Sequence, residues 1–286
     1  MALYVSENVP VASGLGRVSL ERIALCVDLD GTLLRTDLLY ESLLALLAKN
    51  PLYVFLIPFW LLKGKAAVKR ELARRVALPP ESLPYDERVL EILRTTSQRP
   101  RVLCTASDEL LVAPIVEYLG LFEEVICSNG THNLAGHRKA KVLVDRFGEK
   151  GFNYLGNGAV DLDVWRHAAA AIVVNGSPSL VRRASDVARV IDVLPAQAAG
   201  VRTWIKALRV YQWLKNLLVL VPLLTAHRLF DLEAGVQAIV AFLAFGLCAS
   251  GVYVLNDLLD LTPDRMHPRK RKRPFAAGRI PILHGL

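Results

Sequence analysis

The chain has 286 residues, of which 53% are hydrophobic and 22% are charged, and its mean hydropathy is +0.33. This composition is too apolar for an ordinary soluble protein, yet the charged residues leave room for a soluble part. The formal net charge is +8, but no aromatic-interleaved basic surface or nucleic-acid-binding motif accompanies it. We therefore expect a globular part joined to membrane helices, with no nucleic-acid partner.

Residues 1–19 predict an N-terminal tail, and residues 20–195 predict an α/β domain in which strands and helices alternate along the chain. The apolar runs that predict strands are Ile23–Val27, Arg101–Cys104, Glu124–Cys127, Phe152–Leu155, Ala171–Val174 and Arg189–Leu194. The stretches that predict helices between them include Asp108–Leu119, Lys139–Phe147 and Pro178–Ala188. This alternation is typical of a parallel sheet with helices packed on its faces.

Polar residues collect where the predicted strands end. Asp28 and Asp30 follow the first strand, Thr105 follows the second, and the turn Gly156–Asp161 follows the fourth. In parallel α/β sheets, ligands bind at the carboxyl ends of the strands. We therefore expect these residues to meet in one crevice.

The motif Asp28-Leu29-Asp30-Gly31-Thr32, followed in order by Thr105, Lys139 and Asp161, resembles the haloacid-dehalogenase (HAD) superfamily of phosphotransferases. The resemblance covers residues 20–195 and implies a Rossmannoid parallel sheet. It also implies that Asp28 is the nucleophile that forms an aspartyl-phosphate, and that Asp30 is the general acid and base. Thr105 would bind the phosphoryl group, and Lys139 would neutralise its charge, with Lys141 as a substitute.

The same resemblance implies a Mg²⁺ cofactor. Asp28, a backbone carbonyl at Asp30, and acidic or amide side chains at Asp161 and Asn157 would hold the ion, although Asn157 stands where an aspartate is frequent. A carboxylate that attacks a phosphate dianion faces charge repulsion, which a magnesium ion and a lysine cancel. We therefore expect a magnesium-dependent phosphatase that acts on a phosphate ester.

An insertion at about residues 33–99 predicts a helical cap, because Asp37–Ala48 and Lys65–Val76 have helical periodicity. In the HAD superfamily a cap at this point covers the active site, excludes water and selects substrates. The apolar run Pro51–Leu62 lies between the two helices and is too short to span a bilayer. It is either cap core, which we favour, or a patch at the bilayer interface.

Residues 196–203 predict a linker, and residues 204–286 predict a membrane domain. Trp204–Phe230 and Ala234–Leu255 are each apolar enough to cross a bilayer as a helix. A cluster of lysines and arginines follows the second span, so the positive-inside rule places it in the cytoplasm. Two crossings return the chain to its starting side, so we expect a multi-pass cell-membrane protein whose N-terminal domain is cytoplasmic.

Three carboxylates follow the second span. Asp257, Asp260 and Asp264 lie three and four positions apart, so on a continuous helix they would share one face and could converge on Mg²⁺. Pro263 tends to break a helix, so we expect Asp264 to belong to a loop or to a new turn. Convergence of the three on a metal then depends on the fold.

The pattern from Asn256 to Pro274, Asn-Asp-x-x-Asp-x-x-x-Asp-x-x-His-Pro-x-Lys-x-x-Arg-Pro, resembles the first aspartate-rich motif of the UbiA-type intramembrane prenyltransferases. Leu208–Asn216 is similar to the first-helix motif of the decaprenyl-phosphate phosphoribosyltransferase branch, apart from Val210 in place of a common proline. The resemblance implies that four residues bind a magnesium diphosphate: Asn256, Asp257, Asp260 and Asp264. Lys270 and Arg273 would grip phosphate oxygens.

The superfamily has many more transmembrane helices than the two predicted, so we expect either a fragment of a longer fusion or a truncated product. Three hypotheses stay open. The first is a phosphatase fused to a prenyl or phosphoribosyl transferase, acting in consecutive steps of polyprenyl-phosphoryl-ribose synthesis on polyprenyl phosphate or another phosphorylated lipid. The second is a membrane-anchored phosphatase that acts on a small phosphate ester. The third is a scaffold without enzymatic activity, held at membrane lipid.

Overall fold

The computed structural model describes residues 3–5, 23–96, 98–129, 133–197, 199–227 and 231–286. The chain forms two compact units, Met1–Gln197 and Ala198–Leu286. Residues 6–19 of the predicted N-terminal tail lie outside the described residues.

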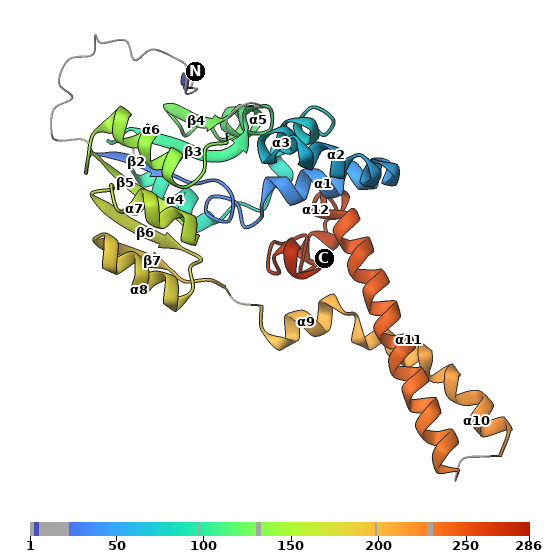
Figure 1. The fold of residues 1–286 in the computed structure, drawn as a ribbon. Helices are drawn as coiled ribbons and strands as arrows, with labels where there is room; N and C mark the ends of the chain where they lie inside the picture. The colour runs from blue at the N-terminus through green and yellow to red at the C-terminus, as the bar shows by residue number, and fades with distance from the viewer. Residues whose placement is uncertain (1–2, 6–22, 97, 130–132, 198, 228–230) are drawn as a thin grey trace. The chain divides into compact units, whose positions relative to one another are not determined.

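The N-terminal unit is built on a parallel sheet of seven strands in the order β1-β4-β3-β2-β5-β6-β7 (Figure 1). The strands are β1 (Leu3–Val5), β2 (Ala24–Val27), β3 (Arg101–Asp108), β4 (Glu124–Ser128), β5 (Phe152–Gly156), β6 (Ala170–Val174) and β7 (Val190–Leu194). The α/β class and the six predicted strands are confirmed. The sequence analysis did not anticipate β1, which pairs with β4 from within the predicted tail.

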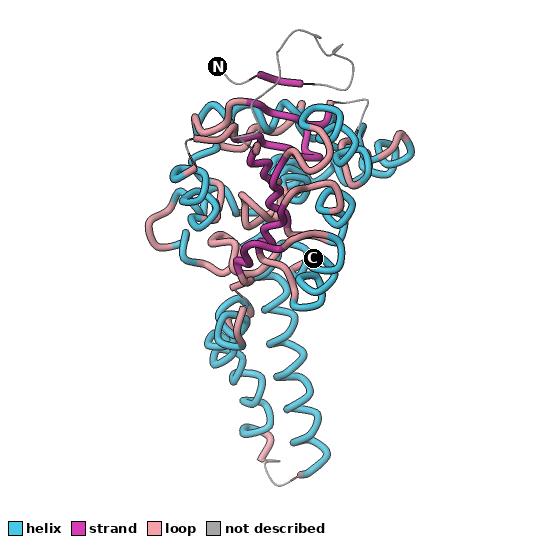
Figure 2. Tube along the Cα trace, turned by 90° about the vertical axis from the view of Figure 1, so that its left-hand side faces the viewer, coloured by secondary structure: helices cyan, strands magenta, loops and turns pink. Residues whose placement is uncertain are grey.

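Helices cover both faces of the sheet. Figure 2 shows the strands as a layer with helices on either side. Leu25 and Val27 of β2 pack on one face with α4 (Glu87–Thr95) and α5 (Glu109–Leu119). The opposite face packs against α6 (His137–Phe147), α7 (Leu162–Trp165) and α8 (Pro178–Val187). Because both faces are buried, β2 and β6 are continuous apolar runs rather than alternating ones.

The insertion between β2 and β3 is helical, and its part before α4 is called the cap here; α4 itself lies within the predicted cap but packs against the sheet. The elements of the cap are α1 (Leu38–Lys49), η1 (Pro51–Phe55), α2 (Ile57–Leu62), α3 (Lys65–Ala73) and η2 (Pro80–Ser82). The part between α1 and α3 has a small core of its own, made by Leu46, Trp60, Val68 and Leu72. Asp37 begins α1 because its carboxylate accepts a hydrogen bond from the backbone N–H of Leu39.

The prediction that Pro51–Leu62 belongs to the cap core is wrong. Trp60 is buried, but most of the large apolar side chains in this stretch are exposed: Leu52, Val54, Phe55, Leu56, Phe59, Leu61 and Leu62. The physical reason is that the run is apolar on every side, whereas α1 and α3 cover only the side that carries Trp60. A hydrophobic run is buried only where another element packs against it.

The C-terminal unit is helical. Its elements are α9 (Val201–Ala207), η4 (Val210–Leu220, a three-ten helix), α10 (Val221–Thr225), α11 (Leu232–Leu259), α12 (Leu261–Met266), η5 (Lys270–Lys272) and η6 (Ile282–His284). The second predicted span is confirmed as one helix, since α11 has 28 residues and is long and apolar enough to cross a membrane. The first predicted span is not a single helix. It is bent by 56° between α9 and residues 210–225, because Arg209 takes a left-handed conformation at the junction.

Close packing joins η4 to α11. A side-chain carbon added at Gly246 would lie 2.7 Å from the ring of Trp213, so only glycine admits the indole at this distance. The indole N–H of Trp213 donates to Ser250 at 3.0 Å, and the Ser250 hydroxyl donates to the carbonyl of Leu208 at 2.6 Å. These contacts satisfy a backbone carbonyl at the bend after α9.

Candidate active site

The carboxyl ends of β2, β3 and β5 bring the expected residues to one edge of the sheet. Strand β2 lies between β3 and β5, so Asp28 and Thr105 emerge from neighbouring strands. Both residues are buried, as are Lys139 and Asp161. A cluster of buried polar side chains at this edge of a parallel sheet is a typical site for ligand binding.

Lys139 lies in the first turns of α6 and reaches back to the sheet. Its ammonium nitrogen Nζ is 2.8 Å from Asp28 Oδ1 and also donates to the hydroxyl of Tyr154 at 2.9 Å. The Tyr154 hydroxyl in turn donates to Asp161 Oδ1 at 3.0 Å. The chain Asp28–Lys139–Tyr154–Asp161 is therefore continuous, and Tyr154 holds Lys139 together with Asp28.

Asp30 is held in one orientation by two donors. The backbone N–H of Leu38 donates to its Oδ1 at 2.8 Å, and the Ser107 hydroxyl donates to its Oδ2 at 2.6 Å. Leu38 begins α1, so the first helix of the cap is attached directly to this carboxylate. Gly31 follows Asp30 and precedes the cap. Its φ is 74°, a conformation that favours glycine.

Burial shifts the titration of both aspartates. It raises the pKa of Asp28 to about 7, against the opposing charge of Lys139. It raises the pKa of Asp30 to about 6. The charge of Asp37 adds to the rise at Asp30, and the hydrogen bonds donated by Leu38 and Ser107 oppose it. Burial lowers the pKa of Lys139, but the charges of Asp28 and Asp161 raise it more, and the net direction is upward. Lys139 therefore stays charged, while Asp30 can carry a proton near neutral pH.

The oxygen atoms that could hold a cation are distributed between side chains and backbone. Asp161 is engaged: its Oδ2 accepts the backbone N–H groups of Asn157 and Gly158, both at 2.9 Å. The Asn157 amide lies against Gly31, where an added side-chain carbon would sit 2.0 Å from Asn157 Nδ2. Within the described residues, no group of three or more His, Cys, Asp or Glu side chains is arranged to hold a metal ion. Asp28, the Asn157 side chain and the Asp30 carbonyl offer oxygen atoms of the kind that Mg²⁺ binds, and this ion takes few protein oxygens and keeps several waters.

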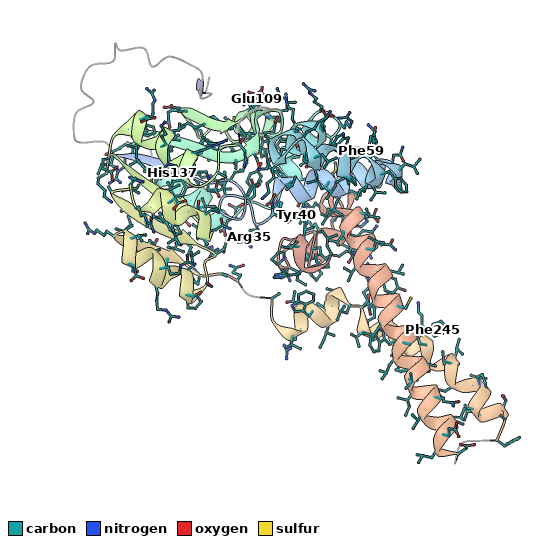
Figure 3. All side chains as sticks on the ribbon, viewed as in Figure 1. Arg35, Tyr40, Phe59, Glu109, His137 and Phe245 are labelled. Carbon is teal, nitrogen blue, oxygen red and sulfur yellow. The ribbon has the colours of Figure 1, made fainter. Side chains whose placement is uncertain are left out.

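The cap is tied to the same edge of the sheet through α3. Lys69 donates to the carbonyl of Ala106 at 2.6 Å. Arg70 pairs with Asp108 at 2.9 Å and with Glu109 at 3.0 Å, and Figure 3 labels Glu109 at the start of α5. The cap therefore contacts the strand that carries Thr105 and Ser107.

Sequence reasoning missed Ser107 and Tyr154. Ser107 lies two residues beyond Thr105, where the sequence predicted that the strand had ended, and Tyr154 looked like one residue of an apolar strand. The available signal for Tyr154 was its hydroxyl, because a buried tyrosine needs a hydrogen-bond partner. Tyr154 lies two positions before the polar turn Gly156–Asp161. Its hydrogen-bond partner is therefore expected among the polar residues of the site.

A second charged cluster lies in the C-terminal unit. Arg273 Nη1 is 3.1 Å from Asp257 Oδ1 and 2.6 Å from Asp264 Oδ2, and Arg209 also pairs with Asp257. Lys270 Nζ lies 3.7 Å from Asp264. Two of the three predicted carboxylates, Asp257 and Asp264, therefore pair with Arg273. Asp264 also pairs with Lys270, the other predicted phosphate-binding cation.

The other two predicted ligands of the second cluster, Asn256 and Asp260, are exposed. Neither makes a side-chain hydrogen bond or ion pair within the described part of the chain. The helix breaks at Asp260, so Asp264 belongs to the separate helix α12, as expected for a new turn. Pro263 lies inside α12, near its start, where its missing N–H costs little.

The parallel sheet, the helical insertion after β2 and the Asp28–Lys139 pair at the carboxyl edge give the N-terminal unit a haloacid-dehalogenase-like fold. The chain also has partial similarity to decaprenyl-phosphate phosphoribosyltransferases of the UbiA family: it is 46% identical to the enzyme of that name from Mycobacterium tuberculosis over 81 residues, which are 27% of each protein. It is 48% identical to the nodulation protein NoeC of Azorhizobium caulinodans over 84 residues, or 29% of this chain and 27% of NoeC.

A longer similarity covers both units. The chain is 37% identical over 270 residues to the uncharacterized protein y4nM of Sinorhizobium fredii, an alignment that spans 92% of this chain and 52% of y4nM. The chain therefore spans about half the length of this relative. No family model matches the sequence.

Solved structures similar to the N-terminal unit include a HAD family hydrolase from Salmonella enterica, with 14% identity and a TM-score of 0.44 over 60% of this chain and 67% of the hydrolase. A phosphoserine phosphatase that holds a phospho-aspartyl intermediate analogue has 16% identity and a TM-score of 0.40, over 60% of this chain and 93% of the phosphatase.

Proposed function

We propose that this chain is a membrane-bound, magnesium-dependent phosphatase that hydrolyses a phosphate ester through an aspartyl-phosphate on Asp28. The observation that carries the proposal is the buried ion pair between Asp28 and Lys139, at 2.8 Å, beside the oriented carboxyl group of Asp30. Only one oxygen of Asp28 is hydrogen-bonded within the described residues, which leaves the other for attack. A structural ion pair would have no need of a second, protonatable carboxyl group beside it.

The proposed reaction has two steps. In the first, the Asp28 oxygen attacks phosphorus, an oxygen–phosphorus bond forms, and the bond between phosphorus and the substrate oxygen breaks as Asp30 gives that oxygen a proton. In the second, Asp30 takes a proton from water, whose oxygen attacks phosphorus and breaks the bond to Asp28. Inorganic phosphate leaves, and both aspartates return to their starting states.

Three other groups support this chemistry. Lys139 balances the charge of the nucleophile and the phosphoryl oxygens, and Thr105 donates a hydrogen bond to those oxygens. A Mg²⁺ ion held by Asp28, the Asp30 carbonyl, Asn157 and Asp161 would supply further positive charge against the phosphate. Because Asp161 already accepts two backbone N–H groups, its proposed role in holding the metal includes orienting the turn that carries Asn157.

For the C-terminal unit, we propose the beginning of a UbiA-type transferase domain. The similarity to decaprenyl-phosphate phosphoribosyltransferases extends over a length close to that of this unit, and we assign it there because the unit contains Asn256–Pro274. Asn256, Asp257, Asp260 and Asp264 would bind a magnesium diphosphate. Arg273 now lies between two of these carboxylates, so binding there requires Arg273 to turn toward the phosphate.

The two proposed chemistries fit one route. A phosphoribosyl transferase that acts on polyprenyl phosphate would make a lipid that carries a sugar phosphate, and the phosphatase would then remove that phosphate. In this proposal α11 and the helical segment Val210–Thr225 before it cross the cell membrane, and the basic residues after α11 stay cytoplasmic with the N-terminal unit. An anchored phosphatase that acts on a small soluble phosphate ester is the second candidate, favoured by the self-contained site in the N-terminal unit. A non-enzymatic scaffold is the third.

The test is phosphate release by the full chain in nanodiscs with Mg²⁺, from a 5-phosphoribosyl polyprenyl phosphate and from ribose 5-phosphate, beside the Asp28→Asn variant. Release from the lipid that Asp28→Asn abolishes supports the proposed route. Much faster release from the soluble ester supports the second candidate instead. Release that is absent from both substrates, or unchanged by Asp28→Asn, overturns the phosphatase proposal in favour of the scaffold.

A further inference from the structure

The cap exposes an apolar surface that no part of the N-terminal unit covers in the described structure. This surface, called here the cap tip, consists of residues 51–62. Leu62 is 86% exposed, Phe55 69%, Leu52 67% and Phe59 63%. Figure 3 labels Phe59 on the part of the cap that lies away from the sheet. Exposed apolar surfaces of this kind mark binding sites for membranes or partners.

The cap tip is a fixed structure rather than a loose loop. Trp60 is buried in the small cap core against Leu46 and Leu72, and the guanidinium of Arg75 lies 4.9 Å from the Trp60 ring centroid. The side chain of Asn50 accepts the backbone N–H of Leu52 at 3.0 Å and starts η1. The exposed side chains are therefore held outward by the packing of their neighbours.

The charged residues that flank the cap tip in the sequence have one sign, and the nearest acidic residue of α3, Glu71, is paired with Arg75. Lys49, Lys63 and Lys65 flank it and are exposed, and the sequence has no aspartate or glutamate from Lys49 to Lys65. A rim of lysines repels basic partners and attracts phosphate groups of anionic lipids. An apolar face with a lysine rim is the composition of a segment that lies in a membrane interface.

We propose that the cap tip inserts into the interface of an anionic lipid bilayer. Phe55, Phe59 and Leu62 would lie among the acyl chains, roughly 5–10 Å deep, with the lysines at the lipid headgroups. The apolar run is too short to cross the bilayer. The choice of a bilayer rather than a protein partner rests on the lysine rim and on α11, an apolar helix in the same chain that is long enough to span a membrane. Tethering by such a helix gives the cap tip a high effective concentration at the membrane surface.

Insertion has a consequence for substrate entry, which rests on the proposed phosphatase function. Helix α3 follows the cap tip directly and carries Lys69 and Arg70, whose bonds to Ala106 and Asp108 close the cap on β3. A cap held at the lipid surface would admit a membrane-borne phosphate ester beneath α3. Insertion is measured by fluorescence quenching, without any measurement of phosphate release. The insertion proposal and the phosphatase proposal can therefore fail independently.

The experiment uses the full chain in liposomes of phosphatidylcholine and phosphatidylglycerol, with Cys248→Ala as background. A cysteine introduced at Phe59 carries an environment-sensitive fluorophore, since the three native cysteines that remain, Cys26, Cys104 and Cys127, are buried. Nitroxide-labelled lipids quench the fluorophore. Ile191→Cys on β7 is the matched control, since Ile191 is also apolar and is 47% exposed. Leu62→Cys is a second reporter, in case the label at residue 59 disturbs Trp60.

We expect quenching at residues 59 and 62 to be several-fold stronger than at residue 191. It should fall when phosphatidylglycerol is omitted, or when the three lysines are changed to glutamate. Equal quenching at all three positions overturns the proposal. A second result also overturns it: Phe59→Cys copies that form disulfide cross-links at high dilution in lipid, while lipid quenching is absent. That result would assign the cap tip to contact with a second copy of the chain.

Discussion

The hydroxyl of Ser107 donates a hydrogen bond to Asp30 Oδ2 at 2.6 Å, across 77 positions of sequence. A donor of this kind stabilises the ionised carboxylate, so it lowers the pKa of Asp30 against the effect of burial, which raises it to about 6. Asp30 must be protonated to act as the acid in the proposed first step. The rate therefore falls as pH rises through the pKa of Asp30.

Replacing Ser107 by alanine should move this alkaline limb to higher pH, because Asp30 then keeps its proton longer. The measurement is the pH dependence of kcat/KM for phosphate release, with Ser107→Thr as a control that retains the hydroxyl. An alkaline limb that stays in place, or that moves to lower pH in Ser107→Ala, would show that Asp30 is not the acid.

The whole pH profile should be narrow. Asp28 must be ionised to attack, so activity rises as pH increases through its pKa of about 7, while the requirement for protonated Asp30 removes activity above about 6. The two limbs overlap, and kcat/KM should peak between these values. A bound cation stabilises the ionised form of Asp28, so raising the Mg²⁺ concentration should shift the acid limb to lower pH. An acid limb that does not respond to Mg²⁺ would argue against a metal at Asp28.

Tyr154→Phe should lower kcat about tenfold, which corresponds to about 1.4 kcal/mol and is typical of one hydrogen bond in a buried network. The reason is that the hydroxyl joins Lys139 to Asp161, at 2.9 and 3.0 Å, and holds the ammonium group in place. KM should change less than kcat if Lys139 acts mainly in the transition state.

Tyr85→Phe is the matched control for Tyr154→Phe, since its hydroxyl donates to the carbonyl of Pro80 at 3.0 Å, within the segment that follows the cap helices. Both variants should keep the thermal unfolding midpoint of the parent to within a few degrees. Equal kcat values for the two variants would deny Tyr154 a positioning role.

Asp86 should be a determinant of stability rather than of activity. Its carboxylate is buried and accepts hydrogen bonds from Arg88 at 2.6 and 2.9 Å and from Asn175 at 3.3 Å. Burial raises the pKa of Asp86, but the hydrogen bonds of Arg88 and the charge of Arg35 lower it more, to about 2. Because this value lies below the ordinary one, the stabilisation is present above about pH 4 and is lost as pH falls toward 2.

Asp86→Asn should therefore lower the free energy of unfolding of the N-terminal unit by about 1–3 kcal/mol at pH 7, and by less at pH 3. Urea unfolding followed by tryptophan fluorescence measures the effect, with the exposed Asp186→Asn as control. A destabilisation that is the same at both pH values would mean that the charge of Asp86 contributes nothing.

Much of the fold was readable from the sequence because its strands are buried on both faces. The runs that became β2 and β6 are continuous in apolar residues, and the polar residues that follow them mark the edge where the site lies. The pairing of Asp28 with Lys139 was implied by the family resemblance and not by spacing, since 111 positions separate them.

The features that the sequence did not reveal have different physical causes. Strand β1 has three residues, too few for a periodic pattern. The exposure of Phe59 depends on which helices flank it, and the bend at Arg209 depends on one residue's backbone conformation. Ser107 has no local pattern that distinguishes it from other serines, because its partner lies on another strand.

The three-ten conformation of Val210–Leu220 changes how far the first apolar segment reaches. A three-ten helix rises about 2.0 Å per residue and an α-helix about 1.5 Å, so the eleven residues of η4 and the five of α10 extend about 30 Å together. That length equals the thickness of a bilayer's hydrocarbon core, about 30 Å. The segment could thus cross with fewer residues than the usual twenty, and α9 need not enter the lipid at all.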